Sequence, residues 1–184
     1  MELSKTPESS TDDSLNFTRQ DFLLLTKARL SLLVIITTIF GYLLALKSYG
    51  NPMDWWKLIH TVIGSAFAAA AASVFNQLME IDIDAKMERT ADRPLPSKKI
   101  KPAVAFIIGW ILAACGIMHL GVKVNSQASA FAAATLFTYM FIYTPMKRRS
   151  GSNTLVGAVS GALPPLIGWT AADGGVLFVQ PWFL

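Results

Sequence analysis

The sequence predicts an all-α fold, a polytopic bundle of transmembrane helices. Hydrophobic residues make up 53% of the chain and charged residues only 15%, whereas a soluble domain usually carries about 25% charged residues. Five runs without Asp, Glu, Lys or Arg match the roughly 17–25 residues of a spanning helix: Leu30–Leu46, Leu58–Met79, Pro102–Val122, Val124–Met146 and Ser150–Ala172. A sixth run, Gly174–Leu184, is shorter. We therefore expect about five full spans plus a partial sixth.

The elements follow in chain order. Residues 1–20 are polar and rich in Ser, Thr and Asp, which is typical of a disordered tail. The first helix should run from about Phe22 to Leu46, and Asn51-Pro52 should form a turn. The second helix carries a run of small residues, Ala66–Ser73, which lets helices approach closely in lipid.

The second half of the chain should continue the bundle. Residues 80–101 should form a long loop, and a short turn at 123–126 should join the third and fourth helices. The fifth helix should begin near Asn153. Pro164 and Pro165 lie in its middle, so we expect its hydrogen-bond ladder to break there. Such a break is tolerated at membrane depth only inside protein or along a cavity.

The basic residues predict the orientation. If the N-terminus is cytoplasmic and the spans alternate, 13 of the 16 Lys and Arg residues fall on the cytoplasmic side. This excess is what the positive-inside rule describes. The net charge of +4 therefore reports topology, and we expect no nucleic-acid partner.

An acidic segment follows the second helix. Between Asn76 and Pro96, five carboxylates alternate with three basic side chains: Glu80, Asp82, Asp84, Lys86, Glu88, Arg89, Asp92 and Arg93. Ionisable groups at a membrane edge are functional candidates, carboxylates suit Mg²⁺, and arginine suits phosphate. We predict a site for a lipid diphosphate and its metal. The alternative is a solvated loop with weak ion pairs.

The spacing within this segment predicts individual roles. If the second helix continues, Asn76, Glu80 and Asp84 fall at i, i+4 and i+8 and share one face. We predict these three as metal ligands, with Asp84 also catalytic and Asn76 also binding the diphosphate. Arg89 and Arg93 lie just beyond and are candidate substrate-binding residues.

A second polar cluster ends the fourth span. Tyr143 and Lys147 are four residues apart, so they share a helix face, and they should emerge on the same side as the acidic segment. Both are candidate catalytic residues, since a cation neutralises a leaving diphosphate and an aromatic ring stabilises positive charge. Arg148 is a candidate substrate-binding residue. The alternative, strongest for Arg149, is a topology signal alone.

The two histidines are not expected to bind metal. His60 and His119 lie near the outer ends of their helices, and neither has a partner histidine at metal-ligand spacing in the sequence. We expect packing or interfacial roles for both.

The acidic segment also carries a resemblance. Asn76, Glu80, Asp84, Arg89-Thr90 and Arg93-Pro94-Leu95 follow the pattern NxxxDxxxDxxxxRTxxRPL, and the chain thereby resembles the UbiA superfamily of intramembrane prenyltransferases. Within it, Tyr143–Trp169 is similar to the branch that modifies haem. The resemblance covers about residues 20–184. Glu80 stands where Asp is usual, and Ala28 stands where the family commonly has proline.

The resemblance implies a function. It implies transfer of a farnesyl group from farnesyl diphosphate to a vinyl group of protohaem IX (haem B), which gives haem O and diphosphate. Mg²⁺ would be the cofactor and haem B a substrate. The setting would be a bacterial cytoplasmic (inner) membrane, with the acidic segment on the cytoplasmic side. The expected partners would be membrane lipid and either haem A synthase or the proteins that assemble a terminal oxidase.

The resemblance also implies a larger fold. Complete members have about nine transmembrane helices and a second acidic motif after the sixth. Residues 21–184 would form the N-terminal part of such a domain, and residues 1–20 a cytoplasmic tail. The chain is therefore expected to lack the second acidic motif.

Three alternatives stay open. A related prenyltransferase would act on an aromatic or quinone precursor, which Tyr143–Trp169 argues against. A small transporter or channel subunit would explain broken helices but not an acidic segment rich in arginine beside a Tyr-Lys pair. A membrane fragment without activity would result if the acidic site needs its missing half.

Overall fold

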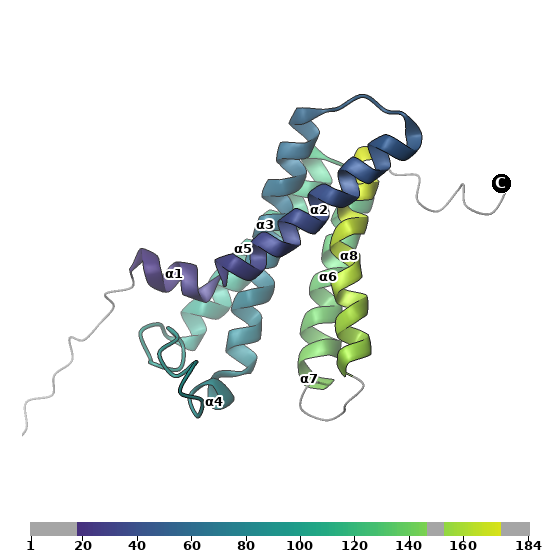
Figure 1. The fold of residues 1–184 in the computed structure, drawn as a ribbon. Coiled ribbons are helices and arrows are strands. Elements are labelled where there is room, and N and C mark those ends of the chain that lie inside the picture. The colour runs from purple at the N-terminus through teal and green to yellow at the C-terminus, as the bar shows by residue number, and fades with distance from the viewer. Residues whose placement is uncertain (1–17, 147–152, 174–184) are drawn as a thin grey trace, which may run out of the picture.

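The computed structural model describes residues 18–146 and 153–173, and every regular element in those residues is helical. The elements are α1 (Arg19–Leu25), α2 (Ala28–Tyr49), α3 (Trp55–Met79), α4 (Ile81–Asp84), α5 (Pro102–Lys123), α6 (Ser126–Phe137), the π-helix η1 (Thr138–Tyr143), α7 (Thr144–Met146) and α8 (Asn153–Asp173). The predicted all-α bundle is confirmed. The long helices place α4 and α7 at one end of the bundle and the turn between α2 and α3 at the other (Figure 1).

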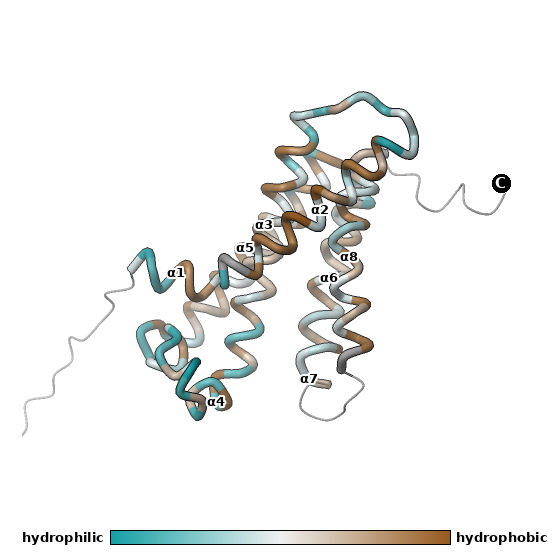
Figure 2. The backbone as a smooth tube through the Cα atoms, in the orientation of Figure 1, coloured by the Kyte–Doolittle hydropathy of each residue, from teal (hydrophilic) through white to brown (hydrophobic). Residues whose placement is uncertain are grey.

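Among the described residues, four helices are long and apolar enough to cross a bilayer: Leu30–Tyr49, Trp55–Met79, Pro102–Lys123 and Leu155–Ala172. Hydrophobic residues occupy the middle of the bundle, and hydrophilic residues gather at its ends (Figure 2). Large apolar side chains also face outward, including Phe40 (63% exposed) and Trp110 (53% exposed). A bilayer solvates such side chains without cost, so this is an integral membrane protein.

The predicted span Val124–Met146 differs from the others. Its helical backbone runs without interruption from Ser126 to Met146, but α-helical bonding gives way to π-helical bonding at Thr138. Both the N–H and the hydroxyl of Thr144 donate to the Tyr139 carbonyl, which satisfies the acceptor at the π-turn. The predicted partial span, Gly174–Leu184, and nearly all of the predicted tail, residues 1–17, lie outside the described residues.

Small residues bring pairs of helices into close contact. α3 packs chiefly on α5, and α2 on α8. A Cβ atom on Gly116 would lie 2.8 Å from the Ala68 nitrogen and 2.9 Å from the Gly64 carbonyl oxygen, so α3 and α5 meet backbone to backbone. Lipid supplies no hydrophobic force between helices, and such close packing replaces it.

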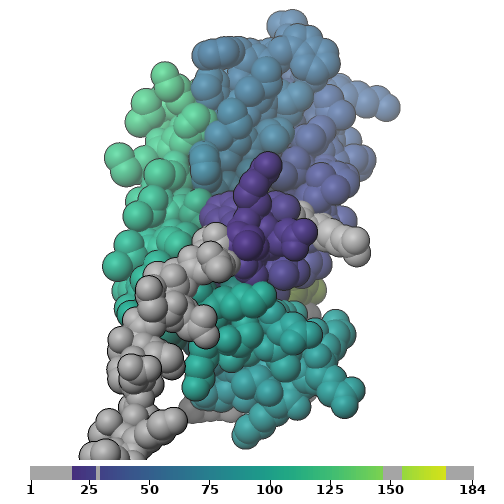
Figure 3. Space-filling view, turned by 90° about the vertical axis from the view of Figure 1, so that its left-hand side faces the viewer, coloured from purple at the N-terminus to yellow at the C-terminus, as the bar shows by residue number. Residues whose placement is uncertain are grey.

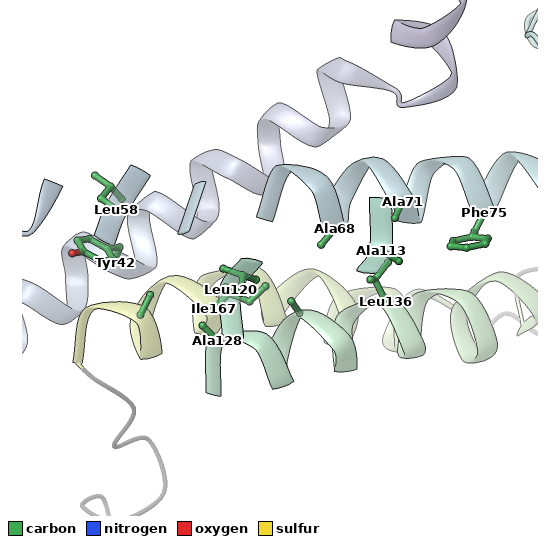
Figure 4. Close-up of a cluster of buried hydrophobic side chains, with 12 residues drawn as sticks. Tyr42, Leu58, Ala68, Ala71, Phe75, Ala113, Leu120, Ala128, Leu136 and Ile167 are labelled. Atoms are coloured by element: carbon green, nitrogen blue, oxygen red, sulfur yellow. The ribbon is translucent and has the colours of Figure 1, made fainter. Parts of the chain in front are cut away.

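The core between the two helix pairs is built from small and branched side chains. Ala68 and Ala71 of α3 lie near Ala113 of α5, while Leu120 and Ile167 meet farther along the bundle (Figure 4). Leu136 of α6 completes this buried cluster. The predicted role of the alanine run in close helix packing is confirmed.

The two prolines remove backbone donors from the fifth span without ending its helix. α8 continues as a helix through Pro164 and Pro165. Pro164 is buried and lines a cavity, and the Pro165 backbone packs against Gly41 of α2. Proline has no N–H, so it leaves backbone carbonyls of the preceding turn without a hydrogen bond, and packing against neighbouring helices makes this loss tolerable.

The two histidines meet at the end of the bundle away from α4. His60 Nδ1 and His119 Nε2 lie 3.0 Å apart, which joins α3 to α5. The two residues are 59 positions apart, so no spacing in the sequence indicates this contact. The ring contacts of His60 with Trp56 and His119 agree with the packing role expected for both histidines. At the same end, the Asn125 side chain donates to the Thr170 carbonyl at 2.8 Å.

Helix α1 lies outside the bundle and packs on the segment 80–101 (Figure 3). Its N-terminus is closed by a capping box, in which the Asp21 carboxylate accepts from the Thr18 N–H (3.0 Å) and hydroxyl (2.7 Å). The same carboxylate accepts from Lys99 Nζ at 3.2 Å. Hydrogen bonds from Thr18, together with the Lys99 cation, hold the pKa of Asp21 below its usual range.

This ion pair predicts that α1 docks in a pH-dependent way. The folded pKa of Asp21 is lowered, so its stabilisation is present above the unfolded value, about 3.9, and is lost as pH falls through the folded value. We expect lower protection of the amides of residues 19–25, measured as the exchange rate relative to the intrinsic rate at the same pH, below about pH 4. Asp21→Asn should show that lower protection already at pH 7. If neither the lower pH nor Asp21→Asn changes the protection of these amides, the prediction is contradicted.

Candidate functional site

A cavity of about 510 Å³ opens among α2, α3, α6, η1 and α8. Much of its wall is formed by apolar or small side chains: Leu30, Val34, Ala68, Ala72, Ala132 and Ile167. Polar groups also line it, and Thr37, Ser65 and Thr135 show that they occur along its length. The charged Lys27 and the phenols Tyr139 and Tyr143 come from the helix ends nearest α4 and α7, here called the polar end of the cavity. A mostly apolar cavity with a charged group at one end suits an amphiphile.

The acidic face stands one helical turn beyond Ser73. α3 ends at Met79, yet the i+4 bonding continues, since the Glu80 N–H donates to the Asn76 carbonyl (3.1 Å) and the Asp84 N–H to the Glu80 carbonyl (2.8 Å). The Asn76 amide also donates to Glu80 Oε2 at 2.8 Å. Asn76, Glu80 and Asp84 are 2%, 8% and 4% exposed. The predicted common face is present, although the helix changes from α3 to α4.

Arg93 folds back onto this face. Its Nη1 atom lies 2.6 Å from Asp84 Oδ2, and the Thr90 hydroxyl donates to the Asp84 carbonyl at 2.8 Å. Leu95 and Ile100 anchor the segment in a cluster with Leu25. The segment is therefore folded against the bundle at Asp84, Leu95 and Ile100, so we call it the cap.

The structure divides the eight ionisable groups in two. Glu80 and Asp84 are buried and Arg93 is partly buried, whereas the other five side chains are exposed: Asp82, Lys86, Glu88, Arg89 and Asp92. Asp82 faces away from the acidic face, as its position in the helix predicts. Arg89, predicted to bind substrate, is not brought into the cluster.

Of the second polar cluster, the structure describes Tyr143, which lies beside Tyr139. The rings of Tyr139 and Tyr143 lie 5.2 Å apart, and both residues line the cavity. A Cβ atom on Gly157 would lie 2.9 Å from the Tyr143 ring, so this glycine makes room for it. The predicted side of Tyr143 is borne out, because its helix ends at the same end of the bundle as α4 (Figure 1). Lys147 and Arg148 lie outside the described residues.

Two residues of this cavity were missed by the sequence reasoning. Tyr139 lies four positions before Tyr143, so the same helical spacing could have found it. Lys27 begins α2 at the cavity wall with φ 46° and ψ 55°. No sequence signal announces this left-handed conformation, which residues with a Cβ atom rarely adopt.

The acidic face has the donor chemistry of a hard cation. Two buried carboxylates and one amide stand in register, and Mg²⁺ is usually bound by one or two carboxylates plus substrate phosphates. Within residues 18–146 and 153–173, no group of three or more His, Cys, Asp or Glu side chains gathers as a metal site. The fit therefore depends on the amide and on oxygens that a ligand brings.

Fold and site together define a membrane-embedded helical protein with a largely apolar cavity and, one helical turn beyond its wall on α3, a buried acidic face. The sequence profile of the UbiA prenyltransferase family matches residues 34–184. The chain belongs to the UbiA prenyltransferase family.

Individual relatives agree with this assignment. The chain is 42% identical to protoheme IX farnesyltransferase of Opitutus terrae, over 91% of this chain and 55% of the relative. It is 40% identical to the protein of the same name from Solibacter usitatus, over 90% of this chain and 58% of the relative. The mitochondrial protein of that name from Homo sapiens is 40% identical over 83% of this chain and 33% of its own. The chain thus spans little more than half of the bacterial relatives.

A solved structure has the same fold. It comes from a study of digeranylgeranylglyceryl phosphate synthase, and it superposes with a TM-score of 0.73 at 24% identity. The match covers 83% of this chain and 52% of that chain.

Proposed function

We propose that the protein transfers a farnesyl group from farnesyl diphosphate to the vinyl group of protohaem IX, giving haem O and diphosphate. The observation that carries the proposal is the buried face of Asn76, Glu80 and Asp84, which begins one helical turn beyond Ser73 of the cavity wall. Relatives about 40% identical carry the name protoheme IX farnesyltransferase, which supports farnesyl as the group and haem as the acceptor.

The chain's own residues would bind and orient the substrate. The farnesyl tail would lie along the alanines and leucines of the cavity, where water is excluded. Arg93 and Lys147 would offset the charge of the diphosphate, as would Arg89 and Arg148 if they turn toward it. Tyr143 would present its ring or its hydroxyl to the reacting end. An allylic C–O bond breaks more readily when charge on its leaving group is stabilised.

Mg²⁺ is part of this proposal. Held by Asn76, Glu80 and Asp84, it would offset negative charge that develops on the departing diphosphate. The second acidic motif that the family resemblance implies is not found in residues 1–184. Residues 21–184 would accordingly form the N-terminal part of the prenyltransferase domain, with residues 1–20 as a tail.

The setting is proposed from charge. The excess of basic residues at the α4 end would place the acidic face and the N-terminus in the cytoplasm, in a bacterial inner membrane. Haem O leaves the site as a lipid-soluble product, so haem A synthase or a terminal oxidase assembly would be the receiving partner.

The test uses the protein expressed from its complete reading frame. Membranes should convert farnesyl diphosphate and haem B to haem O, detected by mass, and EDTA should abolish the product until Mg²⁺ is restored. Membranes from cells that carry the empty vector give the background level of haem O. Prenylation of 4-hydroxybenzoate instead of haem would contradict the proposal and support the quinone-precursor alternative. Full activity in EDTA would show that the reaction does not need Mg²⁺.

A further inference from the structure

The connection between α1 and α2 is held in an unfavourable conformation. Lys27 has φ 46°, and Lys98 is the only other non-glycine residue with positive φ in residues 18–146 and 153–173. The left-handed region crowds the Cβ atom of an L-residue. Such conformations persist where surrounding contacts impose them, and they cluster at functional sites. Lys27 lines the polar end of the cavity.

Gln77 of α3 supplies the contacts that impose this turn. Its side chain is 0% exposed, and Nε2 donates to the carbonyls of Leu24 (2.9 Å) and Leu25 (2.7 Å). These carbonyls belong to the last turn of α1, where helices leave acceptors without α-helical partners, and the Leu24 carbonyl also accepts from the Lys27 N–H at 3.3 Å. On the α2 side, the Ser31 hydroxyl donates to the Thr26 carbonyl at 3.0 Å. Lys27 is thus fixed from both sides.

Packing alone does not explain a glutamine at this position. In the described part of the chain, Gln77 Oε1 is buried without a hydrogen-bond partner. A buried acceptor left unpaired is unfavourable, so a residue kept only to fill space would be apolar. The amide is therefore retained for its two donated bonds.

Gln77 also couples two parts of the site. It follows Asn76, whose amide holds Glu80, so consecutive residues of one helix fix the acidic face and the α1–α2 turn. A displacement of either would change the distance between carboxylates and the Lys27 cation.

We propose that Gln77 is a positioning residue that, through the Leu24 and Leu25 carbonyls, holds Lys27 where its ammonium group binds the diphosphate of the isoprenyl substrate. The inference rests on the proposed function, because that function supplies the diphosphate. An ammonium group is a compact point charge suited to phosphate. Lys27 would then face the diphosphate across from the acidic face.

Binding of farnesyl thiodiphosphate, an analogue that resists cleavage, tests this without haem. The protein from its complete reading frame would be purified in detergent with Mg²⁺. Gln77→Met keeps the length and removes the donor, and Lys27→Met removes the cation. Each should weaken binding about tenfold, the loss expected for one charge-assisted contact. Gln127→Met, the same change on α6 far from α1, should bind as the wild type does.

The double variant gives the decisive readout. If Gln77 acts through Lys27, then Gln77→Met in the Lys27→Met background should cost little further, because coupled residues are not additive. Losses that multiply would show a separate structural role and overturn the proposal. Gln77→Leu, which also removes the donor and adds no charge, repeats the measurement if Gln77→Met fails to fold, and its tenfold loss is expected on the same grounds.

The outcomes separate the two proposals. Wild-type affinity in Gln77→Met would remove Gln77 and leave farnesyl transfer intact. If the wild type binds the analogue and the variants show the expected losses, but the wild type makes no haem O, then haem is not the acceptor and the role of Gln77 stands. A wild-type protein that binds no analogue would remove both.

Discussion

Asp84→Asn should lower haem O formation about 10²–10³-fold, the range seen when one electrostatic stabiliser of a developing anion is removed. The side chain is buried, and its Oδ2 atom is already paired with Arg93 at 2.6 Å. Asparagine keeps the shape but removes the charge, so both a divalent cation and Arg93 lose their partner. The Thr90 hydroxyl bonds the Asp84 backbone carbonyl, so the cap should keep its fold.

Asp82→Asn is the matched control for this change. It removes the same charge two residues away, from an exposed side chain on the opposite side of α4. We expect turnover within twofold of the wild type, since exposed ion pairs contribute little. Rates of haem O formation in membranes, normalised to inserted protein, make the comparison. Equal losses of turnover in both variants would show that the total negative charge of the segment sets the rate and that Asp84 has no individual role.

The acidic face was predictable because it depends on local spacing. Residues four apart share a helix face wherever i+4 bonding holds, and it holds from Asn76 to Asp84 even though α3 ends at Met79. The uncharged runs predicted the long helices for a similar reason, since length and polarity are properties of the sequence alone.

The contacts between helices were not predictable. Gln77 bonds a carbonyl 53 residues away, and His60 meets a histidine 59 residues away. A pattern in the sequence reports that such a side chain is buried or polar, but its partner is chosen by how helices pack. The π-turn at Thr138 and the unbroken helix at Pro164 have the same origin.

Gly168→Ala should prevent α2 and α8 from packing and cost at least about 3 kcal/mol, the upper part of the range for overpacked cores. A Cβ atom at this position would overlap the Thr38 carbonyl oxygen and lie 2.8 Å from the Tyr42 nitrogen. Backbone atoms cannot rotate away as a side chain does, so the helices must separate. Because both helices line the cavity, analogue binding should fall together with stability.

Gly161→Ala on the same helix isolates the steric effect. No atom lies within 4 Å of the Cβ that it would add, and alanine favours a helix over glycine by up to about 1 kcal/mol. Unfolding in mixed micelles, followed by circular dichroism, should therefore show a loss for Gly168→Ala and no loss for Gly161→Ala. If both variants unfold at the wild-type midpoint, then the contact between α2 and α8 has enough slack for a methyl group, and this pair of helices does not set the shape of the cavity.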